Sequence, residues 1–277
     1  MKHIKTTVLT TAAMMAFASC SQKGAQENEG TKSLVVYYSQ TGATKAVAQE
    51  LQTLTGADID SIVVAENPYA GTYEETIARC QKEMADSILP VLKPLTADIA
   101  KYDTIYLGYP VWFGTFARPM MAYLSNTNLE GKVVIPFCTF GSGGLLETSA
   151  ALRNEQPAAT VLEGYGVRNA RIDAMPKELE RFLKEHHFIA GEIEPLPEYS
   201  EQKPVTAAEQ QIFDQACGDY PFPLGTPKTV GSRKGSEGTD YRFTSELFFG
   251  VDDSGSVFTV YVTLVEGQKP VFTRVER

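Results

Sequence analysis

A short run of hydroxyl side chains around one glycine is the clearest candidate for binding chemistry in this sequence. Ser39-Gln40-Thr41-Gly42-Ala43-Thr44 stands between an apolar run, Ser33–Tyr38, and a helical pattern that continues to Leu54. Hydroxyls can donate to phosphate oxygens, glycine lets the backbone wrap closely, and a helix N-terminus offers free amides to an anion. Such a turn can also serve only as a helix cap. Its position directly after the first predicted strand favours a phosphate site.

Residues for several other kinds of chemistry are missing. The loop has neither GxxxxGK[ST] nor GxGxxG, so the common Mg-nucleotide and dinucleotide motifs are absent. Only His186 and His187 follow the N-terminal segment, which argues against triad hydrolases and histidine-ligated metal enzymes, and we predict no metal site. Cys80, Cys138 and Cys217 form no CxxC, and we expect buried free thiols at the first two. The formal charge of -9 argues against a nucleic-acid partner.

Strands and helices alternate through the middle of the chain. Apolar runs predict five strands, at Ser33–Tyr38, Asp58–Val64, Thr104–Tyr109, Val133–Cys138 and Thr160–Tyr165. Helical patterns follow the first strand to Leu54 and then cover Tyr73–Leu89, Phe116–Leu124, Leu145–Asn154 and Pro176–His187. Continuous apolar strands indicate burial on both faces. We therefore predict an α/β fold with a doubly wound five-stranded parallel sheet, whose ligands bind at the carboxyl ends of the strands.

The loops after the first, third and fourth predicted strands resemble the cofactor loops of flavodoxins. Ser-x-Thr-Gly-x-Thr is similar to the flavodoxin phosphate loop, while Tyr109–Thr115 and Thr139–Gly144 are similar to the flavin-flanking loops of short flavodoxins and related quinone reductases. Asn67-Pro68-Tyr69 with Tyr73, Arg79 and Glu83 also resembles one flavodoxin subgroup of anaerobic bacteria. The resemblance covers about residues 33–190 and implies the strand order 2-1-3-4-5.

This resemblance implies a noncovalently bound FMN. Aromatic side chains and close backbone suit its flat, largely apolar ring, and loop amides can tune its redox potential. For Trp112, which we expect in a loop, and for Phe113, packing against the next helix is the alternative; the glycines could simply form a turn. The expected FMN contacts are Ser39, Gln40, Thr41, Gly42, Ala43, Thr44, Pro110, Val111, Trp112, Phe113, Gly114, Thr139, Phe140, Gly141, Gly143 and Gly144.

No side chain stands out as a catalytic acid or base, which fits a flavoprotein because the cofactor carries the difficult chemistry. Tyr73, Arg79 and Arg118 are candidates for orienting a substrate or the phosphate, and a solvated structural role is the alternative for each.

The N-terminus predicts export and a lipid anchor. Residues 1–19 combine a basic start with an apolar run too short to span a bilayer, as in a signal peptide. Phe17-Ala18-Ser19-Cys20 resembles a bacterial lipobox, which implies lipidation of Cys20; a plain secretory signal is the alternative. Residues 20–32 read as a flexible tether. We therefore expect an extracytoplasmic protein, anchored by its lipid to a bacterial membrane.

The end of the chain predicts a second, small α+β domain. Residues 191–204 read as a linker, and residues 205–277 contain one helix, Thr206–Cys217, followed by strands at Lys228–Ser232, Thr239–Phe249, Val257–Val265 and Val271–Val275. This layout resembles a cystatin-like fold, particularly at Gly238–Phe243. Lys234–Glu237 lacks the character of the cystatin inhibitory loop, so we expect partner docking rather than protease inhibition.

Three functions fit these observations. The chain could be an FMN-dependent oxidoreductase that reduces quinones, an electron carrier between protein partners, or an interaction protein that keeps the fold without the cofactor. Export leaves no obvious soluble NAD(P)H pool, which favours an electron-donating protein or a quinol as the redox partner.

Overall fold

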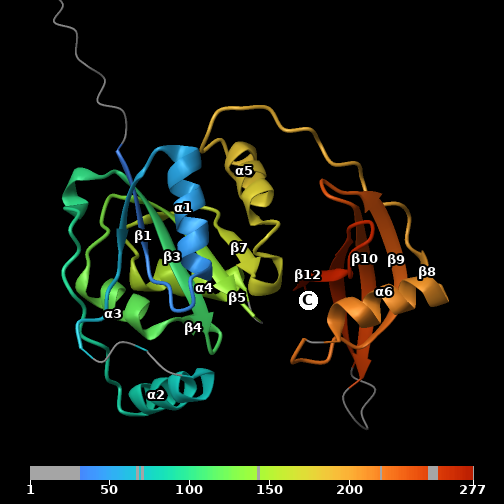
Figure 1. Ribbon diagram of the computed structural model, residues 1–277, viewed down its shortest axis with the longest axis horizontal. Helices are drawn as coiled ribbons and strands as arrows, with labels where there is room; N and C mark the ends of the chain where they lie inside the picture. Colours follow the sequence, from blue (N-terminus) through green and yellow to red (C-terminus); the bar gives the residue numbers. More distant parts are fainter. Residues whose placement is uncertain are drawn as a thin grey trace, which may run out of the picture. The chain divides into compact units, whose positions relative to one another are not determined.

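The computed structural model describes residues 32–66, 69, 72–141, 144–218, 220–248 and 255–276. Its strands form two sheets, one of seven strands and one of five (Figure 1). The predicted signal peptide, Cys20 and the tether up to residue 31 lie outside the described residues, and so do Asn67, Pro68 and Gly143. In the part of the chain that the structure describes, no helix is long and apolar enough to cross a membrane.

The larger sheet has the parallel order that the sequence predicts. Its central path is β2-β1-β3-β5-β6, which is the predicted order 2-1-3-4-5 when the strands are counted as in the sequence. The short β4 pairs antiparallel with β3, and β7 pairs parallel with β5. The strands are β1 Ser33–Tyr37, β2 Asp58–Ser61, β3 Thr104–Trp112, β4 Thr115–Phe116, β5 Val133–Phe140, β6 Thr160–Val161 and β7 Tyr165–Arg168.

The fifth predicted strand is divided into two short strands, β6 and β7, and Pro136 explains the division. β6 pairs with β5 at Val133 and Val134, and β7 pairs with it from Phe137 onward. Pro136 lies between these two ladders and has no amide hydrogen to donate. A continuous ladder along this side of β5 is therefore interrupted at the proline.

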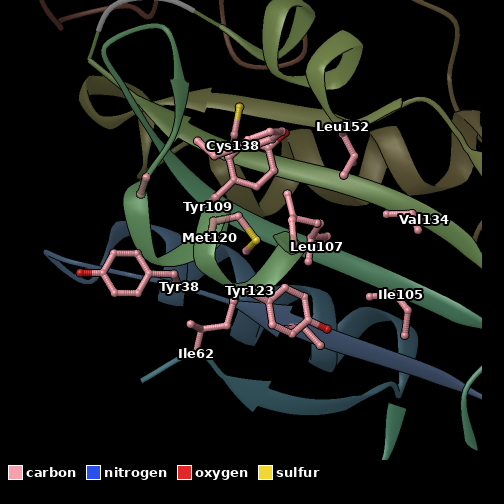
Figure 2. Close-up of a cluster of buried hydrophobic side chains, with 14 of the residues drawn as sticks. Tyr38, Ile62, Ile105, Leu107, Tyr109, Met120, Tyr123, Val134, Cys138 and Leu152 are labelled. Atoms are coloured by element: carbon pink, nitrogen blue, oxygen red, sulfur yellow. The ribbon is translucent and has the colours of Figure 1, made fainter. Parts of the chain in front are cut away.

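Helices cover both faces of this sheet, because alternate strand residues point to opposite sides. On one face Leu34, Val36 and Leu107 pack in a cluster with residues of α3 and α4, and Figure 2 shows part of it. On the other face Val35 packs with residues of α1 and α5. The helices are α1 Ala43–Thr55, α2 Tyr73–Ala85, α3 Arg118–Asn126, α4 Leu145–Glu155 and α5 Met175–Glu185, with 3-10 turns η1 Ile99–Lys101 and η2 Asn169–Arg171.

A separate antiparallel sheet with one helix follows, as predicted. Thr206 and Glu209 form a reciprocal capping box at the start of α6, which fixes where this helix begins. Its Phe213 packs with Phe243 and Phe258 in a core of its own. The order is β12-β11-β10-β9-β8, with α6 Ala207–Cys217, β8 Lys203–Pro204, β9 Thr226–Lys234, β10 Thr239–Phe248, β11 Gly255–Leu264 and β12 Val271–Glu276. The end of the predicted linker therefore forms an edge strand, and the cystatin-like resemblance stays a prediction.

Candidate functional site

The candidate site lies at the carboxyl ends of β1, β3 and β5. The three strands are neighbours in the sheet, since Tyr37 pairs with Gly108 and Pro110 pairs with Thr139. Parallel neighbours end at the same edge, so the loops that follow them lie side by side. The structure thereby brings together the three segments that the sequence singles out, Ser39–Thr44, Tyr109–Thr115 and Thr139–Gly144, apart from the residues that it does not describe.

The first loop leaves the start of α1 open to an anion. Gly42 is the N-cap residue with φ 98°, and as a glycine it offers no side chain to cap the helix. By contrast, α2 begins with a capping box between Thr72 and Glu75. The first amides of a helix have no partner within it, and they carry a partial positive charge. Thr41 and Gly42 are exposed and Ser39 is half-buried, so a phosphate could reach this backbone.

Two predicted contacts of this loop have other partners. The Thr44 hydroxyl lies 2.8 Å from the Thr139 hydroxyl, and both side chains are buried. The Gln40 side chain accepts a bond from the Tyr38 hydroxyl at 2.5 Å and donates to the Tyr69 carbonyl. These two residues therefore hold the loop to its neighbours. The Ser39 hydroxyl accepts a hydrogen bond from the Gly42 amide at 3.2 Å, and Thr41 is exposed. Ala43 is half-buried.

The second segment is a β-hairpin, which corrects the expectation that Trp112 lies in a loop. β3 continues through Pro110 and Val111 to Trp112, which pairs with Thr115 of β4. The turn consists of Phe113 and Gly114, with φ 52° and 73°. Two residues at positive φ make the tight turn whose twist matches a hairpin, and this turn lets the strand pair to its last residue. The sequence does not signal this hairpin clearly, because Phe is unusual at the first position of such a turn.

Trp112 packs among aromatic side chains that the sequence analysis did not assign to the site. Its ring lies 5.9 Å from that of Tyr38 and 5.2 Å from that of Tyr69, both edge-on. Pro110 and Val111 are half-buried, while Phe113 and Gly114 are exposed. The position of Tyr38 at the end of the first apolar run was the available signal, because it places an aromatic ring at the edge where the loops meet.

A buried charge network lies beside this aromatic group. Arg79 Nε lies 2.8 Å from Glu83 Oε1, and Arg118 Nε lies 3.9 Å from Glu83 Oε2. The Tyr69 hydroxyl donates to Glu83. Burial is the larger cause that raises the pKa of Tyr69, and this hydrogen bond raises it further. Arg79 and Arg118 therefore position Glu83, whereas Tyr73 is an exposed residue of α2. The i,i+4 spacing of Arg79 and Glu83 was the sequence signal for this pair.

The third segment combines buried and open positions. Thr139 and Phe140 end β5 and are buried. Gly141 is exposed, and a Cβ built on Gly141 or Gly144 would meet no atom of the described residues within 4 Å. Gly144 is the N-cap residue of α4. Open backbone at this position is compatible with the close approach of a flat ligand.

Comparison with known proteins agrees with this arrangement. The flavodoxin family model matches residues 32–183, more than half of the chain. A curated protein of Rhizobium meliloti named "NAD(P)H dehydrogenase (quinone) 3" is 32% identical over 119 residues, which are 40% of this chain and 54% of that protein. One of Cupriavidus metallidurans, named "NAD(P)H dehydrogenase (quinone)", is 33% identical over 113 residues, 37% and 53% of the respective chains. The chain spans about half the length of these curated relatives.

Solved structures show similar chains. A protein from Bacteroides uniformis described as a flavoprotein is 28% identical with TM-score 0.48, over 55% of this chain and 99% of that one. A Lactobacillus acidophilus flavoprotein solved in complex with FMN is 21% identical with TM-score 0.44. The match covers 53% of this chain and 99% of that one. The parallel sheet, its three loops and the family match over residues 32–183 lead to one conclusion: this chain belongs to the flavodoxin family.

Proposed function

We propose that this protein binds FMN noncovalently and transfers electrons through it outside the cytoplasm, with quinones as acceptors. The observation that carries the proposal is the start of α1, where Gly42 leaves the helix amides without a side-chain cap beside the exposed Thr41. An anionic phosphate suits this site because of the helix dipole and the free amides. Bound FMN would supply one- or two-electron chemistry.

The other two segments would hold and shape the ring. Trp112 offers an aromatic surface that Tyr38 and Tyr69 support from the side. Gly141 and Gly144 offer backbone with open space above it. Quinones are the proposed acceptors because both curated relatives carry quinone dehydrogenase names. An electron-donating protein or a quinol is proposed as the donor, because an exported protein has no obvious soluble nicotinamide pool.

The first test is FMN retention and its dependence on the phosphate. Residues 21–277 mixed with FMN and gel-filtered should keep a flavin spectrum with quenched fluorescence. Thr41→Ala should weaken FMN binding about tenfold or more, since a hydrogen bond to a charged group contributes about 1.5–3 kcal/mol. Riboflavin has no phosphate, so its affinity should be the same in both proteins. A folded protein that retains no flavin would contradict the proposal and favour the interaction-protein function.

The location has its own test. We propose that residues 1–19 are removed and that Cys20 is lipidated, on the basis of the lipobox resemblance. Cys20→Ser should move the protein from the membrane fraction to the soluble exported fraction. Unchanged membrane association of Cys20→Ser would contradict the lipid anchor. Loss of the anchor should leave FMN retention unchanged, because Cys20 lies outside the domain that carries the three loops.

A further inference from the structure

The turn between β3 and β4 carries a strained residue that the fold does not need. Phe113 has φ 52° and Gly114 has φ 73° in a two-residue hairpin connection. Asn and Gly are the residues that suit these positions, and a bulky side chain at positive φ is strained. Phe113 is 51% exposed, so its packing in the fold does not account for the choice. A strained, exposed aromatic residue beside a candidate site indicates a contact with a ligand.

Phe113 also lies at a small apolar pocket. The pocket has a volume of about 70 Å³. A cavity that holds a benzene ring measures about 150 Å³, so this pocket takes only one edge of a ring or its methyl groups. The exposed face of Phe113 would cover the rest of such a ring. The lining residues are Cys80, Met84, Trp112, Phe113, Thr115, Phe116, Arg118 and Met121.

The one charged side chain that lines this pocket, Arg118, is paired except at Nε, which lies 3.9 Å from Glu83 Oε2 and has no hydrogen-bond partner among the described residues. The Arg118 guanidinium donates to the backbone carbonyls of Glu83 and Ile88 and contacts the Met121 sulfur. Burial raises the pKa of the Cys80 thiol to about 11, so it stays neutral at physiological pH. Apart from Thr115 and Arg118, the walls are therefore aromatic rings, thioethers and a neutral thiol. Methionine side chains adapt to differently shaped apolar ligands, which favours an uncharged ring as occupant.

We infer that Phe113 and this pocket form the subsite for the ring of an uncharged acceptor of the quinone class. Trp112 connects the subsite to the proposed flavin site, because it lines the pocket and ends β3, whose neighbours β1 and β5 lead into the other two loops. This assigns Phe113 to the acceptor rather than to FMN. The inference rests on the proposed function, since a quinone subsite serves a flavin that delivers electrons.

Trp112 provides a direct readout, because it is the only tryptophan in the chain. Tetramethyl-1,4-benzoquinone is the probe, since its fully substituted ring has no free position for addition of a thiol. Titrated into the purified FMN-free protein, it should quench Trp112 fluorescence saturably. Phe113→Asn should weaken this binding about tenfold and should raise the midpoint of thermal unfolding, because Asn suits positive φ. Phe222→Asn is the matched control. Phe222 is 58% exposed and lies between α6 and β9, so this substitution should leave the quenching unchanged.

The remaining outcomes separate this inference from the proposed function. FMN affinity should be the same in Phe113→Asn and wild type, and a tenfold loss would overturn the inference by placing the ring of Phe113 on the flavin. Unchanged quenching in Phe113→Asn would overturn it as well. Phe113→Gly is a second variant that also suits the turn, should the first fail to fold. If the protein retains no FMN but Phe113→Asn still loses quinone binding, the subsite stands and the proposed function fails.

Discussion

Thr44 Oγ1 lies 2.8 Å from Thr139 Oγ1, and both threonines are buried. Thr44 belongs to the first turn of α1, and Thr139 lies near the end of β5. This one hydrogen bond therefore connects the proposed phosphate loop to the loop on the opposite side of β3. One hydroxyl donates and the other accepts, and both side chains are buried, so the bond fixes the relative position of the two loops.

The Thr44–Thr139 bond predicts coupled effects on stability. Thr44→Ala and Thr139→Ala should each lower the free energy of unfolding by about 1–3 kcal/mol, because each leaves one buried hydroxyl without its partner. The double variant should lose less than the sum of the two. Urea unfolding of the four proteins measures this coupling. Thr41→Ala, at an exposed position, is the control and should be close to wild type; additive losses would contradict the bond.

Gly108 matters for packing, because the absence of a side chain there leaves room for the ring of Phe137. A Cβ at this position would lie 2.1 Å from Cζ of Phe137, whose side chain is 1% exposed and packed in the core. Gly108→Ala should therefore destabilise the protein by about 1–3 kcal/mol through overpacking. Calorimetry should show this loss, and Phe137→Leu in the same protein should restore part of it by removing the ring. Equal stability of Gly108→Ala and wild type would show that the ring has space to shift.

Asp60 predicts how stability depends on pH. Burial alone would raise the pKa of this carboxyl, but hydrogen bonds from Ala97, Thr96 and Ser61 hold it below its ordinary value. A lowered pKa in the folded state gives stability that is present above the unfolded value, about 4, and is lost as the pH falls through the folded value.

Asp60→Asn should therefore cost on the order of 1 kcal/mol at pH 7, and the difference from wild type should shrink below about pH 4. Urea unfolding between pH 3 and pH 7 measures this difference. Asp173→Asn, at an exposed position of the same domain, should give a small and constant difference. A loss from Asp60→Asn that stays the same at pH 3 would assign the effect to shape rather than to charge.

The parallel sheet could be predicted because strands buried on both faces read as continuous apolar runs, and Val35 and Val36 indeed pack on opposite faces. Its strand order was implied by the resemblance to flavodoxins. Features that depend on a single backbone atom, or on residues that are distant in the sequence, could not be predicted. Pro136 divides the fifth strand because its neighbour in space needs an amide hydrogen that proline lacks. The Phe113 turn escapes sequence rules because its composition contradicts its geometry. The Tyr69–Glu83 hydrogen bond could not be predicted because it depends on how Tyr69, which precedes α2, packs against that helix.

Gly141 offers the sharpest separation of folding from binding. A Cβ there would meet no atom within 4 Å in the part of the chain that the structure describes, and the φ of Gly141 lies outside the left-handed region. Gly141→Ala should therefore leave the free energy of unfolding within about 0.5 kcal/mol of wild type. If the flavin ring approaches this backbone as proposed, the added methyl group should weaken FMN and riboflavin about equally, by tenfold or so, because the contact is to the ring. Thr41→Ala should weaken FMN alone. A Gly141→Ala protein that binds both flavins like wild type would move the ring away from this loop, while the phosphate site at α1 would be unaffected.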